Sequence, residues 1–380
     1  MENFIAHNPT ALHFGKDILA GLGSVIQQYG KRVLFVYGKG SIKKTGLYDQ
    51  IIGLLKAINA EIFEYEGIKS NPVVQDVDAA AEMGRRNKID VILAVGGGSV
   101  IDSAKIISIT IPVDHSGWDF YTRKAHPKKA IPLIAVLTLA ATGTEMNPFA
   151  VLSNHETMIK DGYGNKHIYP AHSFLDPQLT FTVPKDYTAY GIADLIAHCF
   201  EAYFGNGDAT LSDRFIISII REAIEYGPSL VDDLHNYELR EKIMYAATMA
   251  LNGLTLQGKV SGDWGVHAIG HCLSLLYDIP HGASLTIVYP AWMRYLKDRI
   301  PERIALLGSD LFREPLSTDE SIQKIEAFFC TIGCPTRLSD MNIPGIQKQL
   351  IYETMVINKV SGANLKLKEP DYFPLIDLFL

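Results

Sequence analysis

The stretch DVILAVGGGSVIDSAK, residues 90–105, joins a short apolar run to a helical pattern through three consecutive glycines. The apolar run predicts a strand that is buried on both faces, and the pattern after the glycines predicts a helix. Glycine lets a ligand approach the backbone closely, and a helix start offers unpaired N–H groups to an anion. The stretch therefore predicts either a phosphate or pyrophosphate cradle or a structural tight turn, although it lacks the usual G-x-G-x-x-G spacing. Asp102 and Lys105 lie in the first helical turns, where they either face a ligand or cap the helix in solvent.

The same alternation of strand and helix extends over the first half of the chain. It implies right-handed crossovers and a parallel sheet that is covered by helices on both faces. After residue 187 the pattern is helical throughout, so the break near Pro184 predicts an α/β domain over 1–184 and an all-α domain over 185–380. Strands are expected at 32–38, 61–68, 90–97 and 129–139, and helices at 46–60, 71–88 and 99–109.

Composition limits the class of protein. The chain has 380 residues, of which 47% are hydrophobic and 20% charged, and its net charge is −7. Without a block of basic residues, no binding of nucleic acid or of an anionic membrane is expected. The N-terminus lacks the basic and apolar regions of a signal peptide, and four scattered cysteines do not make a disulfide framework. These features favour a cytoplasmic protein.

Two segments of the second half combine histidines with a carboxylate. Asp194 and His198 are four residues apart among apolar residues, so they share one face of a predicted helix. His267 and His271 repeat this spacing, and His281 follows in a Pro-His-Gly sequence. A buried carboxylate is costly unless it is paired, and a divalent metal can pair it; one carboxylate with imidazoles suits Fe²⁺ or Zn²⁺. The simpler alternative is a set of core or surface histidines.

A second glycine-containing turn, VYGKGSIKKTG, follows the first predicted strand. In a doubly wound domain this turn commonly contacts the adenosine ribose, and an acid there favours NAD(H). The segment from Gly38 to Ser41 contains no acid, while Lys39, Lys43 and Lys44 provide positive charge. The turn therefore favours the 2′-phosphate of NADP(H) over NAD(H), or it is a lysine-rich solvated turn.

The chain resembles the iron-containing (group III) alcohol dehydrogenases, and is most similar to the NADPH-dependent butanol dehydrogenase and aldehyde reductase branch. The resemblance implies a Rossmann-like N-terminal domain and an all-α C-terminal domain, in a dehydroquinate synthase-like architecture. It also implies that His271 lies near the substrate and relays protons. The motifs that support it are YGKGSIKKTGLYD, NPVV, AVGGGSVIDSAK, LTLAATGTEMNPFAV, LDPQLTFTVP, ADLIAHCFE and WGVHAIGHCLSLLYDIPHG. The metal ligands that it implies are Asp194, His198, His267 and His281.

The resemblance also implies a set of cofactor residues. Gly97, Gly98 and Ser99 would bind the pyrophosphate, and Asn71 the adenosine side. The residues expected around the nicotinamide and its ribose, or packed near the cofactor, are Thr138, Thr142, Asn147, Lys160 and Leu179. Gly38, Ser41 and Asp102 complete the expected cofactor site.

The function expected is hydride transfer between NAD(P)H and an aldehyde or primary alcohol, as in a butanol dehydrogenase. The partner is a small aldehyde or alcohol, and the chain is expected to form a homodimer. A glycerol dehydrogenase-like polyol oxidoreductase and a dehydroquinate synthase-like lyase share the architecture and are alternatives. A metal-binding protein without catalysis is a further alternative, but it would give the glycine loop no purpose.

Overall fold

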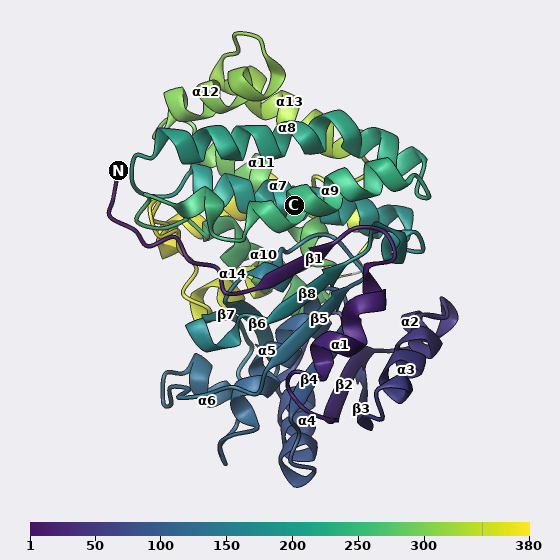
Figure 1. Ribbon diagram of the computed structural model, residues 1–380. Coiled ribbons are helices and arrows are strands. Elements are labelled where there is room, and N and C mark those ends of the chain that lie inside the picture. The colour runs from purple at the N-terminus through teal and green to yellow at the C-terminus, as the bar shows by residue number, and fades with distance from the viewer. Residues whose placement is uncertain (344) are drawn as a thin grey trace. The chain divides into compact units, whose positions relative to one another are not determined.

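The computed structural model of the protein describes residues 1–343 and 345–380 and contains two compact units. The α/β unit consists of His7–Val183 and His235–Met244, and the helical unit of Met1–Ala6, Pro184–Leu234 and Tyr245–Leu380. Figure 1 shows both units, coloured by residue number. The expected division after residue 184 into two separate domains stays a prediction.

The α/β unit is built on a parallel sheet of six strands in the order β1-β8-β5-β4-β2-β3. This confirms the predicted fold class. A separate antiparallel hairpin joins β6 to β7. The strands are β1 (Ala11–Phe14), β2 (Arg32–Gly38), β3 (Glu61–Ile68), β4 (Val91–Gly96), β5 (Leu133–Leu137), β6 (Phe149–Asn154), β7 (Ile159–Gly164) and β8 (His172–Leu175).

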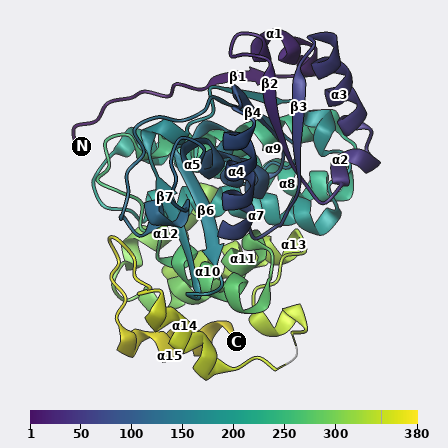
Figure 2. The ribbon, with the colours of Figure 1, turned by 90° about the horizontal axis from the view of Figure 1, so that it is seen from below.

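Both faces of this sheet are buried. On β2, Val33 and Phe35 belong to one hydrophobic cluster, whereas Leu34 and Val36 belong to another. Successive side chains of a strand point to opposite faces, so each cluster packs on its own face. Helices α1 and α3 supply the first cluster and α4 and α5 the second, as Figure 2 shows along the sheet. The helices of this unit are α1 (Leu22–Ile26), α2 (Ser41–Lys44), α3 (Leu47–Ala57), α4 (Val74–Arg86), α5 (Gly98–Thr110) and α6 (Trp118–Tyr121).

The helical unit has helices from Lys185 onward, and no strand follows β8 among the residues described. None of the helices in the described ranges has the length and apolar character needed to cross a bilayer. Helix α9 begins in the α/β unit and ends in the helical unit. The helices are α7 (Lys185–Tyr203), α8 (Thr210–Asp232), α9 (Tyr237–Ala250), α10 (Gly265–Tyr277), α11 (His281–Leu296), α12 (Pro301–Phe312), α13 (Thr318–Thr331), α14 (Lys348–Ile357) and α15 (Glu369–Phe379).

Candidate functional site

Three helices of the helical unit bring a carboxylate and imidazoles together. Asp194 lies in the middle of α7, while His267 and His281 lie in the first turns of α10 and α11. The ligand atoms of these three residues all lie within 4.8 Å of one another. His198 is one turn after Asp194, and its ring centroid is 4.8 Å from that of His267. The structure therefore groups three of the four expected ligands closely and places His198 beside them.

The distances fit a divalent ion. Asp194 Oδ1 lies 3.5 Å from His198 Nδ1, 4.0 Å from His267 Nε2 and 3.7 Å from His281 Nε2. Four ligands at metal bonds of ~2.0–2.2 Å in a tetrahedron would be separated by about 3.4 Å. The three nitrogens therefore lie within about 0.6 Å of the separation from Asp194 Oδ1 that a shared ion requires.

The chemistry of the donors fits as well. His267 Nε2 and His198 Nδ1 are buried and have no hydrogen-bond partner among the residues described. Buried polar atoms are nearly always satisfied, so an ion is a natural partner for both nitrogens. Burial lowers the pKa of His267 to about 3 and holds the pKa of His198 well below its usual value. Both rings are therefore neutral at physiological pH, the form in which imidazole binds metals.

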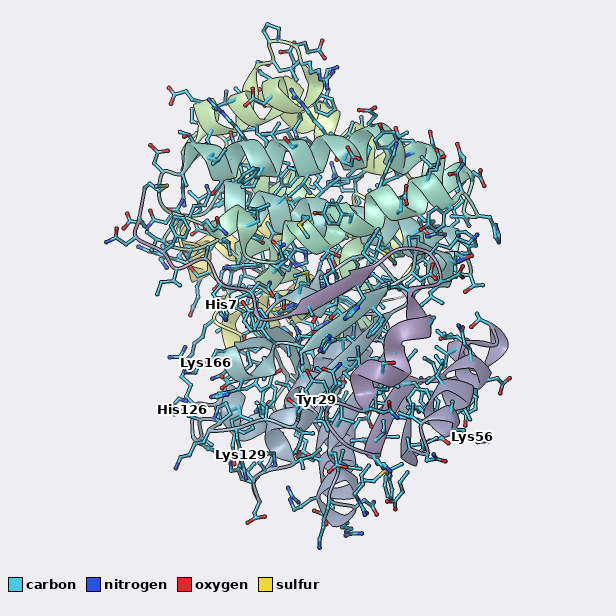
Figure 3. All side chains as sticks on the ribbon, in the orientation of Figure 1. His7, Tyr29, Lys56, His126, Lys129 and Lys166 are labelled. Carbon is cyan, nitrogen blue, oxygen red and sulfur yellow. The ribbon has the colours of Figure 1, made fainter. Side chains whose placement is uncertain are left out.

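His271 is one turn beyond His267 on α10, and its ring centroid lies 5.5 Å from that of His281. It is partly exposed, whereas His267 is buried. The side chain is thus next to the metal cluster without belonging to the close group of ligand atoms. By contrast, His7 and His126, which match no metal motif, are exposed at the outside of the molecule (Figure 3).

Two buried carboxylates near this cluster were missed by the sequence reasoning. Glu201 accepts a hydrogen bond at 2.7 Å from His267 Nδ1, and Asp263 accepts bonds from the backbone of Asn364 and Leu365. Burial raises the pKa of Glu201 to about 7 and that of Asp263 to about 6, while backbone hydrogen bonds lower both. Glu201 had a signal in the sequence, since it is seven residues after Asp194 and shares its helix face.

The expected cofactor residues of the α/β unit gather at the carboxyl ends of the strands. Gly97 follows β4 and Gly98 begins α5, as the glycine stretch predicts. A Cβ at Gly98 would lie 2.9 Å from Thr142 Oγ1, so only glycine allows this approach of the loop after β5. Thr138 donates its backbone N–H to Gly96 O at 3.0 Å, which joins the ends of β4 and β5.

Other expected residues line up beside this edge. Lys160 Nζ donates to Asn71 Oδ1 at 2.8 Å, and Ser99 Oγ donates to the carbonyl of Ser70. Leu179 lies in a short 3₁₀ turn and packs against the hydrophobic cluster that contains Val33 and Phe35 of β2. Doubly wound domains bind their ligands at the carboxyl ends of their parallel strands.

Asp102 and Lys105 point inward and hold the loop between β5 and β6. Asp102 Oδ1 accepts from Thr144 Oγ1 at 2.5 Å, and Oδ2 accepts from the backbone N–H of Val151 at 2.9 Å. Lys105 is fully buried, and its Nζ donates to Thr144 Oγ1 and to both oxygens of Asn147 at 2.7–3.0 Å. The contacts observed for Asp102 are therefore structural ones, made with the loop that contains Thr142 and Asn147.

The turn after β2 lacks an acid of its own. Gly38 ends the strand, and Ser41 begins the short helix α2 after Gly40 at φ +109°. However, Lys43 Nζ forms an ion pair at 2.7 Å with Glu66 of β3. Part of the positive charge expected at this turn is thereby neutralised.

Comparison with known proteins agrees with this geometry. Residues 9–177 match the family model described as iron-containing alcohol dehydrogenase, and residues 188–367 match that of the C-terminal domain of the same family. The chain belongs to the iron-containing alcohol dehydrogenase family. It is an oxidoreductase that uses a nicotinamide cofactor and a metal ion on alcohols or aldehydes.

Individual relatives cover nearly the whole chain. A probable NADH-dependent butanol dehydrogenase 2 of Bacillus subtilis is 45% identical over 92% of each chain. The NADPH-dependent aldehyde reductase YqhD of Escherichia coli is 38% identical over 91% of this chain and 90% of its own. The crystal structure of NADH-dependent butanol dehydrogenase A from Thermotoga maritima has a TM-score of 0.95 at 37% identity, covering 100% of this chain and 99% of its own. These names do not favour the glycerol dehydrogenase-like or dehydroquinate synthase-like alternatives.

Proposed function

We propose that the protein reduces small aliphatic aldehydes to primary alcohols, with Asp194, His198, His267 and His281 as the ligands of Fe²⁺ or Zn²⁺. The observation that carries this proposal is the convergence of three imidazole nitrogens on Asp194 Oδ1, at 3.5–4.0 Å, in a buried part of the helical unit. Relatives named butanol dehydrogenase and aldehyde reductase support the substrate class.

Each group has a distinct part in the proposed reaction. When bound, the metal supplies Lewis-acid polarisation of the carbonyl and the nicotinamide supplies a hydride. Asp194 provides the negative charge that offsets the ion, and the neutral histidines fix its position. His271, partly exposed beside His281, supplies from a ring nitrogen the proton that turns the former carbonyl oxygen into the alcohol hydroxyl, and regains a proton from water.

The α/β unit is proposed to hold NADP(H). Gly97, Gly98 and Ser99 bind the pyrophosphate at the start of α5, where backbone N–H groups are unpaired. Asn71 and Lys160 contact the adenosine and nicotinamide sides, and Thr138, Thr142, Asn147 and Leu179 line the remainder, on a loop secured by Asp102.

Preference for NADP(H) over NAD(H) rests on the turn from Gly38 to Ser41. Gly38 has no carboxylate that would repel a 2′-phosphate, and Lys39 adds positive charge. The competing reading is NAD(H), favoured by the Lys43–Glu66 ion pair and by relatives named NADH-dependent. The ratio of kcat/KM for NADPH to that for NADH decides between them, and a ratio above one supports the proposal.

The function is tested by removing metal from the purified protein and restoring it with Fe²⁺ or Zn²⁺. Aldehydes of increasing chain length are then supplied with NADPH or NADH, and the absorbance of the reduced cofactor is followed. Turnover that requires the metal and an aldehyde is expected. Equal rates with and without metal, or no turnover of any aldehyde by metal-loaded protein, would contradict the proposal.

The assembly and location complete the proposal. We expect a homodimer in the cytoplasm, acting on a small aldehyde or alcohol and on neither nucleic acid nor membrane. Light scattering on the metal-loaded protein measures the mass directly, and a value near 42 kDa, the mass of one chain, would contradict the dimer.

A further inference from the structure

We infer that Glu201 is the positioning residue of the metal site: it fixes His267 in the tautomer that leaves Nε2 available to the ion. The inference rests on the proposed function, because it assigns a role toward the metal that Asp194, His198, His267 and His281 are proposed to bind.

Glu201 makes four hydrogen bonds to three residues of the segment 263–267. Its Oε1 accepts from His267 Nδ1 at 2.7 Å and from the backbone N–H of His267 at 3.2 Å. Its Oε2 accepts from the backbone N–H of Trp264, and its own carbonyl accepts from the N–H of Asp263 at 2.9 Å. The side chain is 2% exposed, so water does not compete for these bonds.

These bonds select one tautomer of His267. In its ionised form Glu201 is an acceptor only, so the proton of the neutral ring then lies on Nδ1. Nε2 then has a free lone pair, and it is the nitrogen 4.0 Å from Asp194 Oδ1. Metal-bound histidines commonly donate their second nitrogen to a carboxylate, which fixes the ring and makes it a better ligand.

The same carboxylate also fixes the backbone that presents the ring. Trp264, the residue before α10, has φ +66°, a left-handed conformation that is uncommon for residues other than glycine. Such a conformation costs of order 1–3 kcal/mol and persists only where the surroundings determine it. The bond from the Trp264 N–H to Glu201 supplies that restraint, so α10 begins in the orientation that aims His267 at Asp194.

Glu201 lies on the same helix, α7, as two of the proposed metal ligands. Asp194, His198 and Glu201 are at spacings of four and three residues, so they share one helix face. One rigid helix therefore holds two proposed ligands directly and a third through its partner. A carboxylate that served only to stabilise the fold would not need to contact the side chain of a ligand.

The test is Glu201→Gln, with Asp263→Asn as the matched control. The glutamine has nearly the same size but cannot accept at both of its ends. If its amide group faces Nδ1, His267 must place its proton on Nε2, which then cannot bind metal. Asp263 is equally buried and accepts backbone N–H groups in the same unit, and among the described residues its hydrogen bonds do not include the His267 ring.

The affinity of each full-length protein for Zn²⁺ is measured by competition with a chelator, and the visible spectrum of bound Co²⁺ reports the ligand geometry. Glu201→Gln is expected to weaken Zn²⁺ binding by about 10–100-fold and to alter the Co²⁺ spectrum. Asp263→Asn is expected to lower the melting temperature while leaving the Zn²⁺ affinity within about threefold. The reason is that Asp263 does not hydrogen-bond to a metal-binding side chain, and only such partners tune the affinity for the metal.

The outcomes separate the inference from the function. Unchanged Zn²⁺ affinity in Glu201→Gln, or an equal loss in both variants, would overturn the inference while the unaltered enzyme still binds metal and reduces aldehydes. An unaltered protein that binds no metal would instead overturn the proposed function. If Glu201→Gln does not fold, Glu201→Asp replaces it: the charge is kept but the carboxylate withdraws from Nδ1, and unchanged affinity in it would equally overturn the inference.

Discussion

Replacing Lys105 by methionine removes a buried charge but keeps a side chain of similar length. The ammonium donates to Thr144 Oγ1 at 2.7 Å, to Asn147 Oδ1 at 3.0 Å and to the carbonyl of Phe149 at 2.7 Å. Burial lowers its pKa to about 8, so the group is still charged at pH 7. Its removal takes from the buried carboxylate of Asp102 the stronger of the two lysine charges that stabilise it, and removing one of two buried opposite charges typically costs about 3–5 kcal/mol.

For a unit of this size each kcal/mol lowers the melting temperature by roughly 2–4 °C, so a fall of roughly 6–20 °C is expected in the transition of the α/β unit. Calorimetry measures it. The KM for the nicotinamide cofactor should rise about tenfold, or ~1.4 kcal/mol, because the loop with Thr142 and Asn147 loosens. Lys56→Met, at an exposed lysine (Figure 3), is the control and should change stability by less than about 0.5 kcal/mol. A shift no larger than that of the control, with unchanged KM, would refute the reasoning.

Three further outcomes are expected. His267→Ala or His281→Ala should release the metal and abolish aldehyde reduction while the transition of the α/β unit stays in place; metal retained at one ion per chain would contradict the ligand assignment. His271→Ala should keep metal and cofactor but slow turnover by about 10²-fold or more, with a flatter pH–rate profile, as for loss of a general acid; loss of metal would make it a ligand, and an unchanged rate a packing residue. Gly38→Asp should lower the ratio of kcat/KM for NADPH over NADH by at least about tenfold, and an unchanged ratio would show that the turn does not contact the 2′-phosphate.

Strands β2, β4 and β5 were predictable because nearly all of their residues are buried. The expected strands at 32–38 and 61–68 coincide with β2 and β3, and α3, α4 and α5 lie within a few residues of their expected ranges. Strands β1 and β8 were missed, since each has only four residues and the two pair with each other across about 160 positions. The β6–β7 hairpin was missed as well, because IKDGYG contains more polar and glycine residues than apolar ones.

At the site, residues spaced within one helix could be predicted from the sequence, whereas contacts between distant residues could not. A spacing of four residues indicated that Asp194 and His198 share a face. Nothing local connects Glu201 to His267, which is 66 positions later, so this pair emerges only from the packing of α7 against the start of α10. At Asp102, a helix start next to a glycine loop suggested a contact with a ligand; both of its oxygens bond within the protein, and a contact with the cofactor stays a prediction.

The way the chain is divided between the two units limits how the protein can be taken apart. The α/β unit includes residues 235–244, and Met244 is fully buried in the same cluster as Leu34 and Ile92. A fragment that ends at Val183 would therefore lack part of its own core, and the remaining piece would retain a segment that belongs to the other unit. Exchanging halves between relatives by a single crossover would separate residues that pack together. The two halves are consequently expected to be inherited and engineered as one piece, although each is proposed to bind a different reactant.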